Sequence, residues 1–335
     1  MTGSGRFGLV IGIEGGGTKT DCLVVDVDGA VRGNGKGGPS NILVVGKEKA
    51  KESILSAVQE ATQGIGKSAR ALALCVGAAG SGNPEGRRMM QEALEDLDLA
   101  ERNLIVHDGV ISLMGATAGR PGIVVVAGTG CVCFGMNSKG EFARSSGWGF
   151  ILGDEGSGYD IARRAMTSSL RAHDGRGPPT SLSDKFVKRL ELSTIEDLVK
   201  KVYAEAMERH EVSALAPLVL EAAQEGDKVA TDILTYAGQE LGLAVVAVAL
   251  RLNMQGEEFQ VATMGGILDH FGEFVTGPLR AVIMTSAPRA QIVRARFKPV
   301  VGAVIMAARE VGIDVEGDFL AKLAEGAAES ANQPS

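Results

Sequence analysis

The sequence has few aromatic residues and no surplus of positive charge. Aromatic side chains make up 4% of the 335 residues, and the formal net charge is -7 at pH 7. A protein that binds the nucleic-acid backbone concentrates Lys and Arg along one stripe, and no such stripe is present. We therefore expect no nucleic-acid partner.

Long apolar segments and a disulfide framework are also missing. The longest apolar helical run, residues 241–252, contains Arg251 and falls short of the roughly 20 residues that cross a bilayer. The segment Met1 to Gly5 is short and polar, unlike a secretory leader. Four cysteines in a chain of this length are typical of small core thiols. These features predict a cytoplasmic protein with no membrane partner.

Glycine, by contrast, is abundant. The chain has 46 glycines and 45% hydrophobic residues, a composition that favours closely packed strands and helices. Apolar runs such as 71–76 end at glycines and are followed by stretches of helical spacing such as Pro84–Leu97. The length allows about two domains. We predict an α/β protein.

Two stretches of the chain share one layout: an apolar strand, a Gly-rich loop, a second strand and a Gly turn. The loops are Gly15-Gly16-Gly17-Thr18-Lys19 and Gly128-Thr129-Gly130. Gly17 and Gly29 lie 12 positions apart, as do Gly128 and Gly140. Glycine lets main-chain N–H groups approach an anion closely, and threonine adds a hydroxyl donor. One such loop is a weak signal, but the duplication predicts a pair of phosphate-binding hairpins.

Other glycine motifs are interpreted from their context. Gly265-Gly266 stands between a strand, 259–263, and a helix, where it offers main-chain donors to a nucleotide. Residues 33–38 satisfy the spacing G-x-G-x-x-G but do not open a helix after a strand, as a dinucleotide fingerprint requires. We expect a loop there, followed by an extended segment at 42–45.

The second half of the sequence predicts several helices. Two of them are expected at 154–172 and 193–209, and Ser193 to Glu196 forms a capping box at the start of the second. The glycines and proline of residues 119–122 interrupt the chain. We therefore predict domains at 1–118 and 119–313, the latter with helical insertions, and a C-terminal helix and tail at 314–335 whose function the sequence does not reveal.

Three segments together resemble one family. They are Gly12 to Thr20, Ala127 to Gly130 and, most specifically, Ser146-Gly147-Trp148-Gly149-Phe150-Ile151-Leu152-Gly153-Asp154-Glu155-Gly156-Ser157. They are similar to the N-acetylglucosamine kinase group, which stands with the BadF/BadG/BcrA/BcrD ATPases in the actin, hexokinase and Hsp70 superfamily. The likeness runs from Val10 to Ala307. It implies two ribonuclease-H-like domains, the actin-like ATPase fold, around a central cleft that binds ATP and a sugar.

The resemblance also implies site residues. The ATP-binding residues would be Gly15, Gly16, Gly17, Thr18, Lys19, Gly128, Thr129, Gly130, Gly265 and Gly266. The sugar-binding residues would be Asn41, Asp108, Thr129, Gly147, Trp148, Gly149 and Asp154. Asp108 would be the catalytic base, since phosphoryl transfer to a hydroxyl needs a carboxylate that accepts the proton. Glu14 would hold Mg²⁺, through water.

Each of these side chains has a plainer interpretation as well. Asp108 and Asp154 could cap the helices that follow them, and Glu14 could be a solvated loop acid. Trp148, the only tryptophan, could belong to the core rather than to the wall of a sugar pocket.

The expected function is ATP-dependent phosphorylation of an amino sugar, most simply N-acetylglucosamine at its 6-hydroxyl, by a homodimer. Ser146 stands where the family usually has glycine, so glucosamine, N-acetylmuramic acid and glucose remain alternative substrates. An ATPase activator of an acyl-CoA dehydratase or reductase would need a cluster cysteine directly before Gly128, where the chain has Ala127. A sugar-sensing regulator would bring a DNA-binding segment, and the sequence shows none.

Overall fold

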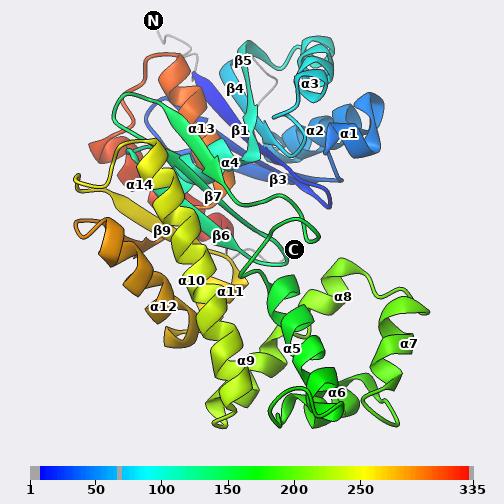
Figure 1. Ribbon diagram of the computed structural model, residues 1–335. Helices are drawn as coiled ribbons and strands as arrows, with labels where there is room; N and C mark the ends of the chain where they lie inside the picture. The colour runs from blue at the N-terminus through cyan, green and yellow to red at the C-terminus, as the bar shows by residue number, and fades with distance from the viewer. Residues whose placement is uncertain (1–7, 66–69, 332–335) are drawn as a thin grey trace, which may run out of the picture. The chain divides into compact units, whose positions relative to one another are not determined.

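The computed structural model describes residues 8–65 and 70–331, so the N-terminal segment at 1–7 and the end of the predicted tail at 332–335 lie outside the described residues. The chain forms two compact units (Figure 1). Unit 1 combines Met1–Arg120 with Ala295–Ser335, and unit 2 is Pro121–Arg294. Each unit contains a five-stranded mixed sheet with helices, which confirms the predicted α/β class.

The sheet of unit 1 has the strand order β3-β2-β1-β4-β5. Its strands are β1 Leu9–Gly15, β2 Thr20–Asp26, β3 Val31–Gly37, β4 Ala71–Ala78 and β5 Ala100–His107. The first three form an antiparallel meander, and β4 and β5 run parallel to β1. Its helices are α1 Ile42–Val45, α2 Lys47–Ala61, α3 Pro84–Leu97, α4 Asp108–Ala116, α13 Pro299–Glu310 and α14 Gly317–Ala331.

Alternate residues of β1 enter two different hydrophobic cores. Ile11 and Ile13 pack with residues of α2 and α3, whereas Val10 packs with residues of α13 and α14. Both faces of the sheet are therefore covered, as expected for strands that are apolar throughout.

The assignment of residues 295–313 differs from the predicted domain division. These residues group with unit 1, and α13 lies against β1, as the orange helix beside the blue strand shows in Figure 1. The backbones approach so closely that a Cβ at Gly12 would lie 2.5 Å from the backbone nitrogen of Val304. The sequence suggested a continuous second domain because nothing local marks the return of the chain to the first sheet.

Two short segments of unit 1 also differ from the prediction. Residues 33–37, expected as a loop, belong to β3, and residues 42–45, expected to be extended, form the helical turn α1. Alternate glycines of β3 face α2, where a Cβ at Gly33, Gly35 or Gly37 would lie 1.9, 2.1 or 2.0 Å from a helix carbonyl oxygen. These glycines therefore allow a strand to pack directly against a helix backbone, and the glycine-rich pattern concealed that strand.

The sheet of unit 2 has the strand order β10-β9-β6-β7-β8. Its strands are β6 Gly122–Ala127, β7 Cys131–Met136, β8 Phe142–Ser145, β9 Gln260–Met264 and β10 Gln291–Arg294. Its helices are α5 Gly158–His173, α6 Leu182–Leu190, α7 Asp197–Tyr203, α8 Arg209–Ser213, α9 Ala216–Gln224, α10 Lys228–Arg251, α11 Gly266–His270 and α12 Glu273–Ser286. By length and composition α10 could cross a membrane, but most of its apolar window is buried inside unit 2.

The single helix predicted at 193–209 is wrong, because α7 occupies only the middle of this segment and α8 begins at its last residue. Ala206 has a φ of 52° and interrupts the helix. The capping box is not formed either: the carboxylate of Asp197 accepts the backbone N–H groups of Ser193 and Thr194 at 3.1 and 2.9 Å. The helix expected from 154 begins at Gly158, four residues later than predicted.

The hairpin duplication extends to hydrogen bonds that the sequence did not reveal. The Asp26 side chain accepts the N–H groups of Asp28 and Ala30, each at 3.0 Å. Asn137 of unit 2 accepts those of Lys139 and Glu141, also at 3.0 Å. The turn after the second strand is thus built in the same way in both units.

Candidate functional site

Three parallel strands of unit 1 end at one edge of its sheet. Gly15 of β1 aligns with Ala78 of β4, and Ala78 aligns with His107 of β5. The first loop, Gly15–Lys19, therefore lies at the same edge as Asp108, which directly follows β5. Ligand sites of open α/β sheets form at such carboxyl ends.

The first loop is a tight turn with an exposed tip. The N–H of Gly16 donates to the carbonyl of Lys19 at 2.9 Å, and Gly17, Thr18 and Lys19 are exposed. The carbonyl of Gly16 accepts the N–H groups of Ser40 and Asn41 at 3.0 and 3.1 Å. These bonds connect the first loop to Asn41, although the sequence separates them by more than twenty positions.

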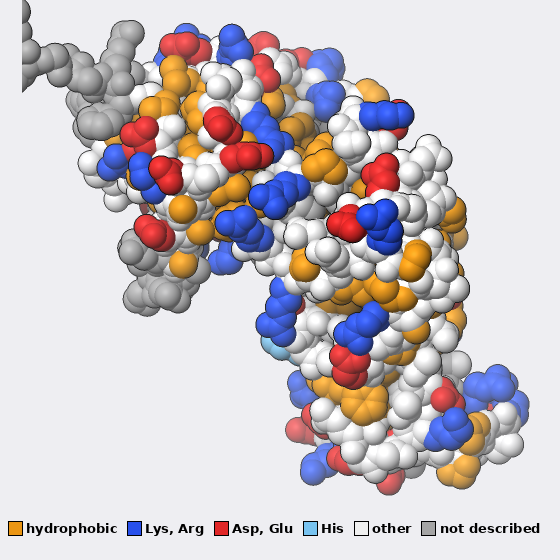
Figure 2. All heavy atoms as spheres, turned by 90° about the vertical axis from the view of Figure 1, so that its left-hand side faces the viewer, with side chains coloured by type: hydrophobic (Ala, Val, Ile, Leu, Met, Phe, Trp, Pro, Cys, Tyr) orange, Lys and Arg blue, Asp and Glu red, His pale blue; other side chains and the backbone are white. Residues whose placement is uncertain are grey.

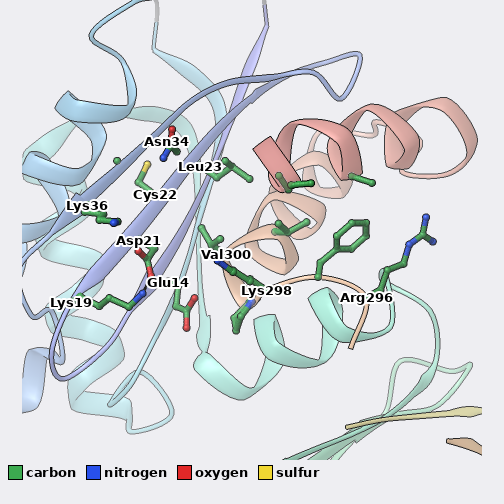
Figure 3. A pocket seen from close by; sticks show the side chains of 17 residues that line it. Glu14, Lys19, Asp21, Cys22, Leu23, Asn34, Lys36, Arg296, Lys298 and Val300 are labelled. Atoms are coloured by element: carbon green, nitrogen blue, oxygen red, sulfur yellow. Dashed lines mark ion pairs between the residues drawn. The ribbon is translucent and has the colours of Figure 1, made fainter. Parts of the chain in front are cut away.

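Charged side chains gather where β1 and β2 meet the first loop. Glu14 and Asp21 lie opposite each other in the antiparallel register, and Lys19 forms an ion pair with Asp21 at 2.5 Å (Figure 3). Burial and the neighbouring charge of Asp21 raise the pKa of Glu14 above its usual range, while Lys19 opposes this shift. Glu14 is therefore a partly buried carboxyl group of a strand, not a solvated loop acid.

These carboxylates border a cavity of about 590 Å³ inside unit 1. Figure 3 shows Glu14, Asp21 and Lys19 together beside it, with Val300 and Lys298 at the start of α13. Among residues 8–65 and 70–331, no cluster of three or more His, Cys, Asp or Glu side chains could hold a metal by itself. Mg²⁺ characteristically takes one or two carboxylates and completes its shell with water and substrate phosphates. Glu14 fits that mode of binding.

Asp108 occupies the first position of α4, beside His107. One oxygen of its carboxylate lies 2.8 Å from both the Nδ1 atom of His107 and the backbone nitrogen of Gly109. The N-cap residue of α4 is His107, and its Nδ1 atom lies 3.0 Å from the same N–H group of Gly109. The Asp108 carboxylate therefore shares this helix N-terminus with His107. The side chain of Asp108 is 43% exposed, which leaves it accessible to a ligand.

Asn41 presents an unsatisfied acceptor in the same unit. Its Oδ1 atom is buried, and no described residue donates a hydrogen bond to it. A Cβ at Gly80, in the turn after β4, would lie 2.9 Å from this oxygen, so glycine leaves room beside it. The Ser81 hydroxyl is also buried and, within the described ranges, unpartnered. Sequence analysis missed Ser81, and nothing distinguishes it locally from other loop serines.

In unit 2 the second loop and Gly265-Gly266 also lie at the carboxyl ends of neighbouring parallel strands, β6 and β9. The second loop, Gly128–Gly130, is closed by the N–H of Gly128, which donates to the carbonyl of Gly130 at 2.8 Å. The N–H of Gly158, at the start of α5, donates to the carbonyl of Gly128 at 2.8 Å. Gly265 follows the parallel strand β9 with a φ of 103°, and a Cβ there would lie 2.5 Å from the carbonyl oxygen of Ala127. The structure thus brings Gly265 and Gly266 to the same edge as the second loop.

The segment after β8 forms the remaining part of this region. Trp148 is 69% exposed, so a core role is wrong, and the Arg144 guanidinium lies 4.6 Å from the centre of its ring. Gly147 and Gly149 both have positive φ values, 73° and 89°. Asp154 is only 3% exposed and precedes α5, whose cap is Ser157, so it is not the helix cap.

Asp154 pairs with an arginine that sequence analysis missed. The Nη2 atom of Arg209, the first residue of α8, lies 2.5 Å from its Oδ2 atom. The two side chains line a hollow of about 280 Å³ together with Gly130, Gly147 and Gly149. Because 55 positions separate the partners, no local pattern could have revealed the pair.

The cysteines and the surface charges bear on the alternative functions. All four cysteines are buried, and burial raises the pKa of the Cys22, Cys75 and Cys131 thiols to about 12. In the free protein these thiols are therefore protonated and shielded from solvent. On the face drawn in Figure 2, acidic and basic side chains are interspersed.

Comparison with known proteins identifies relatives that cover most of the chain. The chain is 35% identical over 305 residues to an N-acetylmuramic acid/N-acetylglucosamine kinase of Clostridium acetobutylicum, covering 90% of this chain and 98% of that protein. It is 31% identical over 311 residues to an N-acetyl-D-glucosamine kinase of Dictyostelium discoideum, covering 89% and 97%. A crystal structure assigned as an N-acetylglucosamine kinase from Chromobacterium violaceum is similar with a TM-score of 0.70 and 27% identity, covering 90% and 99%.

Residues 11–307 match the model of one family, which spans both units and all the candidate residues described above. This match and the two curated relatives confirm the resemblance inferred from the glycine loops and the segment from Ser146 to Ser157. The chain belongs to the BadF/BadG/BcrA/BcrD ATPase family.

Proposed function

We propose that the protein is an ATP-dependent kinase that phosphorylates an amino sugar, N-acetylglucosamine, at its 6-hydroxyl. The observation that carries the proposal is the common strand edge of unit 1. There the first loop, Asp108 and the unsatisfied oxygen of Asn41 stand together. The relatives named as kinases of N-acetylated amino sugars support the substrate class.

In this proposal both loops contribute to binding the same ATP. Their main-chain N–H groups and the hydroxyls of Thr18 and Thr129 bind phosphate oxygens, and Gly265-Gly266 binds the adenosine. Glu14 would hold Mg²⁺ through water, and the ion would supply charge neutralisation at the phosphates. The ionised side chain is needed for this role, although burial disfavours it in the free protein.

Asp108 acts as the general base. Its carboxylate, on a side chain that is 43% exposed, accepts the proton of the sugar hydroxyl while the N–H of Gly109 holds one of its oxygens. Most of the acceleration in such reactions comes from positioning and from charge stabilisation, and the base adds about 10²–10⁴-fold. Asn41 and Asp154 orient the sugar, the first as acceptor and donor and the second as acceptor. Trp148, exposed and flanked by glycines, would cover it.

A coupled ADP-release assay tests the proposal. It is run with glucose, glucosamine, N-acetylglucosamine, N-acetylmannosamine and N-acetylmuramic acid, and the phosphorylated position is identified by mass spectrometry and NMR. We expect sugar-dependent ADP release with the N-acetylated amino sugars and a 6-phosphate product. ADP release that is unaffected by every sugar would reject the kinase assignment.

We further propose that the enzyme acts in the cytoplasm as a homodimer. Glucosamine, N-acetylmuramic acid and glucose remain the alternative substrates, since Ser146 replaces a glycine of the family and has a φ of 60°. The ATPase activator is disfavoured, because the cysteine nearest the second loop, Cys131, follows it and is held buried by a hydrogen bond to the carbonyl of Glu155 at 3.0 Å.

A further inference from the structure

We propose that Arg209 is a specificity-determining residue that binds the carboxylate of an acidic amino sugar such as N-acetylmuramic acid. The inference rests on the proposed kinase function. It adds the substrate class, an acidic amino sugar, and the side chain that recognises its charge. The starting observation is that Arg209 lines the hollow beside the second loop and that one of its N–H donors has no hydrogen-bond partner among the described residues.

The guanidinium of Arg209 is fixed on one side only. Its Nη2 atom contacts Asp154, whereas its Nε atom is buried and receives no hydrogen-bond partner from any residue in the described ranges. A buried donor without an acceptor is unfavourable, so an acceptor is expected from a bound ligand. The side chain as a whole is 38% exposed, which leaves a route for that ligand.

The surrounding residues keep the position of the guanidinium well defined. A Cβ at Gly130 would lie 2.1 Å from Nη2 of Arg209 and 2.8 Å from Oδ2 of Asp154, so glycine in the second loop leaves the space that this ion pair occupies. The guanidinium carbon also lies 5.7 Å from the centre of the Phe150 ring. These contacts hold the arginine directly beside the loop that we assign to phosphate binding.

The charges in the hollow favour a substrate that carries both hydroxyls and an acid. Asp154 and Arg209 are the charged residues among those that line it, and the others are glycine, valine and cysteine. Asp154 can accept from sugar hydroxyls but cannot attract a carboxylate. Arg209 presents a planar fork of donors that matches a carboxylate bidentately, and its positive charge offsets the repulsion from Asp154. A neutral sugar would leave this fork unused.

The test compares two substrates in one set of variants. The kcat/KM values for N-acetylmuramic acid and N-acetylglucosamine are measured for the wild type, Arg209→Gln and Arg209→Lys, with Arg171→Gln as the control. Arg171 is an exposed arginine of α5 that does not line the hollow. We expect Arg209→Gln to lower the value for N-acetylmuramic acid about 10- to 100-fold more than the value for N-acetylglucosamine, mainly through KM. Arg209→Lys should recover part of the loss.

A second measurement uses only the wild-type protein and so does not depend on the folding of a variant. The methyl ester of N-acetylmuramic acid keeps the size of the substrate but removes its charge. We expect its KM to exceed that of the free acid about tenfold or more. Equal losses for both sugars in Arg209→Gln, or equal KM values for acid and ester, would overturn the inference and leave Arg209 as a residue that positions Asp154.

Failure of the inference is distinct from failure of the proposed function. If the wild type phosphorylates N-acetylglucosamine but not N-acetylmuramic acid, the kinase assignment stands and the role of Arg209 is rejected. If no amino sugar stimulates ADP release, the proposed function itself is rejected.

Discussion

The two loops share a backbone design but differ in the chemistry beside them. Each follows the central strand of a mixed sheet and leads into a second strand whose turn is closed by an Asp or Asn side chain. Around the first loop the charged residues Glu14, Asp21 and Lys19 come from the hairpin itself. Around the second, Asp154 and Arg209 arrive from later elements. The duplication therefore repeats the backbone of the turn, while the charged side chains beside it have different origins in the two units.

Among the substitutions that test this difference between the units, Asp108→Asn is expected to have the largest effect on turnover. Asp108→Asn removes the proposed base and should lower kcat about 10²–10⁴-fold with little change in nucleotide affinity. Turnover is measured by ADP release and affinity by calorimetry with a non-hydrolysable ATP analogue. Asp28→Asn, at an exposed position in the turn after β2, is the control. Near-normal turnover by Asp108→Asn would remove this residue from the mechanism.

The next effect concerns the strand β3, whose glycines pack against the backbone of α2. Gly35→Ala places a Cβ 2.1 Å from the carbonyl oxygen of Ala57 in α2. Because neither backbone can move freely, we expect the free energy of unfolding to fall by about 1–3 kcal/mol. Chemical denaturation measures it, with Gly64→Ala as control, since no described atom lies within 4 Å of a Cβ there. An unchanged denaturation midpoint would refute the close packing of β3 on α2.

A matched pair of substitutions tests whether the loops act alike. In the described structure a Cβ at Gly17 or at Gly128 meets no atom within 4 Å, so alanine should be accommodated in the free protein. An added methyl group at either tip would obstruct a phosphate. We expect Gly17→Ala and Gly128→Ala each to raise the KM for ATP about tenfold without lowering the thermal midpoint. A response confined to one variant would show that the loops are not equivalent.

The smallest effect is expected from Glu14, whose ionisation changes the free energy of unfolding. Its raised pKa means that the folded protein binds this proton more tightly than the unfolded chain does. The free energy of unfolding therefore declines as the pH rises from the usual value near 4.5 through the raised value in the folded protein.

Glu14→Gln should remove that dependence. It should raise the thermal midpoint at neutral pH, with a difference that shrinks as the pH is lowered, and it should also increase the Mg²⁺ concentration needed for activity. Thermal melts across pH, without nucleotide, measure the first effect. A lower midpoint for the variant at neutral pH would contradict the assigned cause of the pKa shift.

The sequence was sufficient for features that depend on local pattern. The two glycine hairpins, the helix Pro84–Leu97 and the α/β class are confirmed, because strand–turn spacing and a proline in the first helical turn are local signals. The family was also recognised correctly from three short segments. The roles of the individual site residues stay predictions.

Features that depend on tertiary packing were missed. The alternate glycines of β3 resembled a loop because their purpose is contact with α2, which only the fold reveals. The return of residues 295–313 to the first sheet leaves no local mark. The same is true of the ion pair between Asp154 and Arg209, since α8 is positioned by the packing of unit 2.

The most direct test of the central claim, that both loops contribute to binding one ATP, is calorimetric titration with a magnesium complex of a non-hydrolysable ATP analogue. The wild type, Gly17→Ala and Gly128→Ala are compared at the same ionic strength. The account predicts one nucleotide per chain for the wild type and weaker binding for both variants. Absence of binding heat with the wild type, or unchanged affinity in either variant, would contradict it.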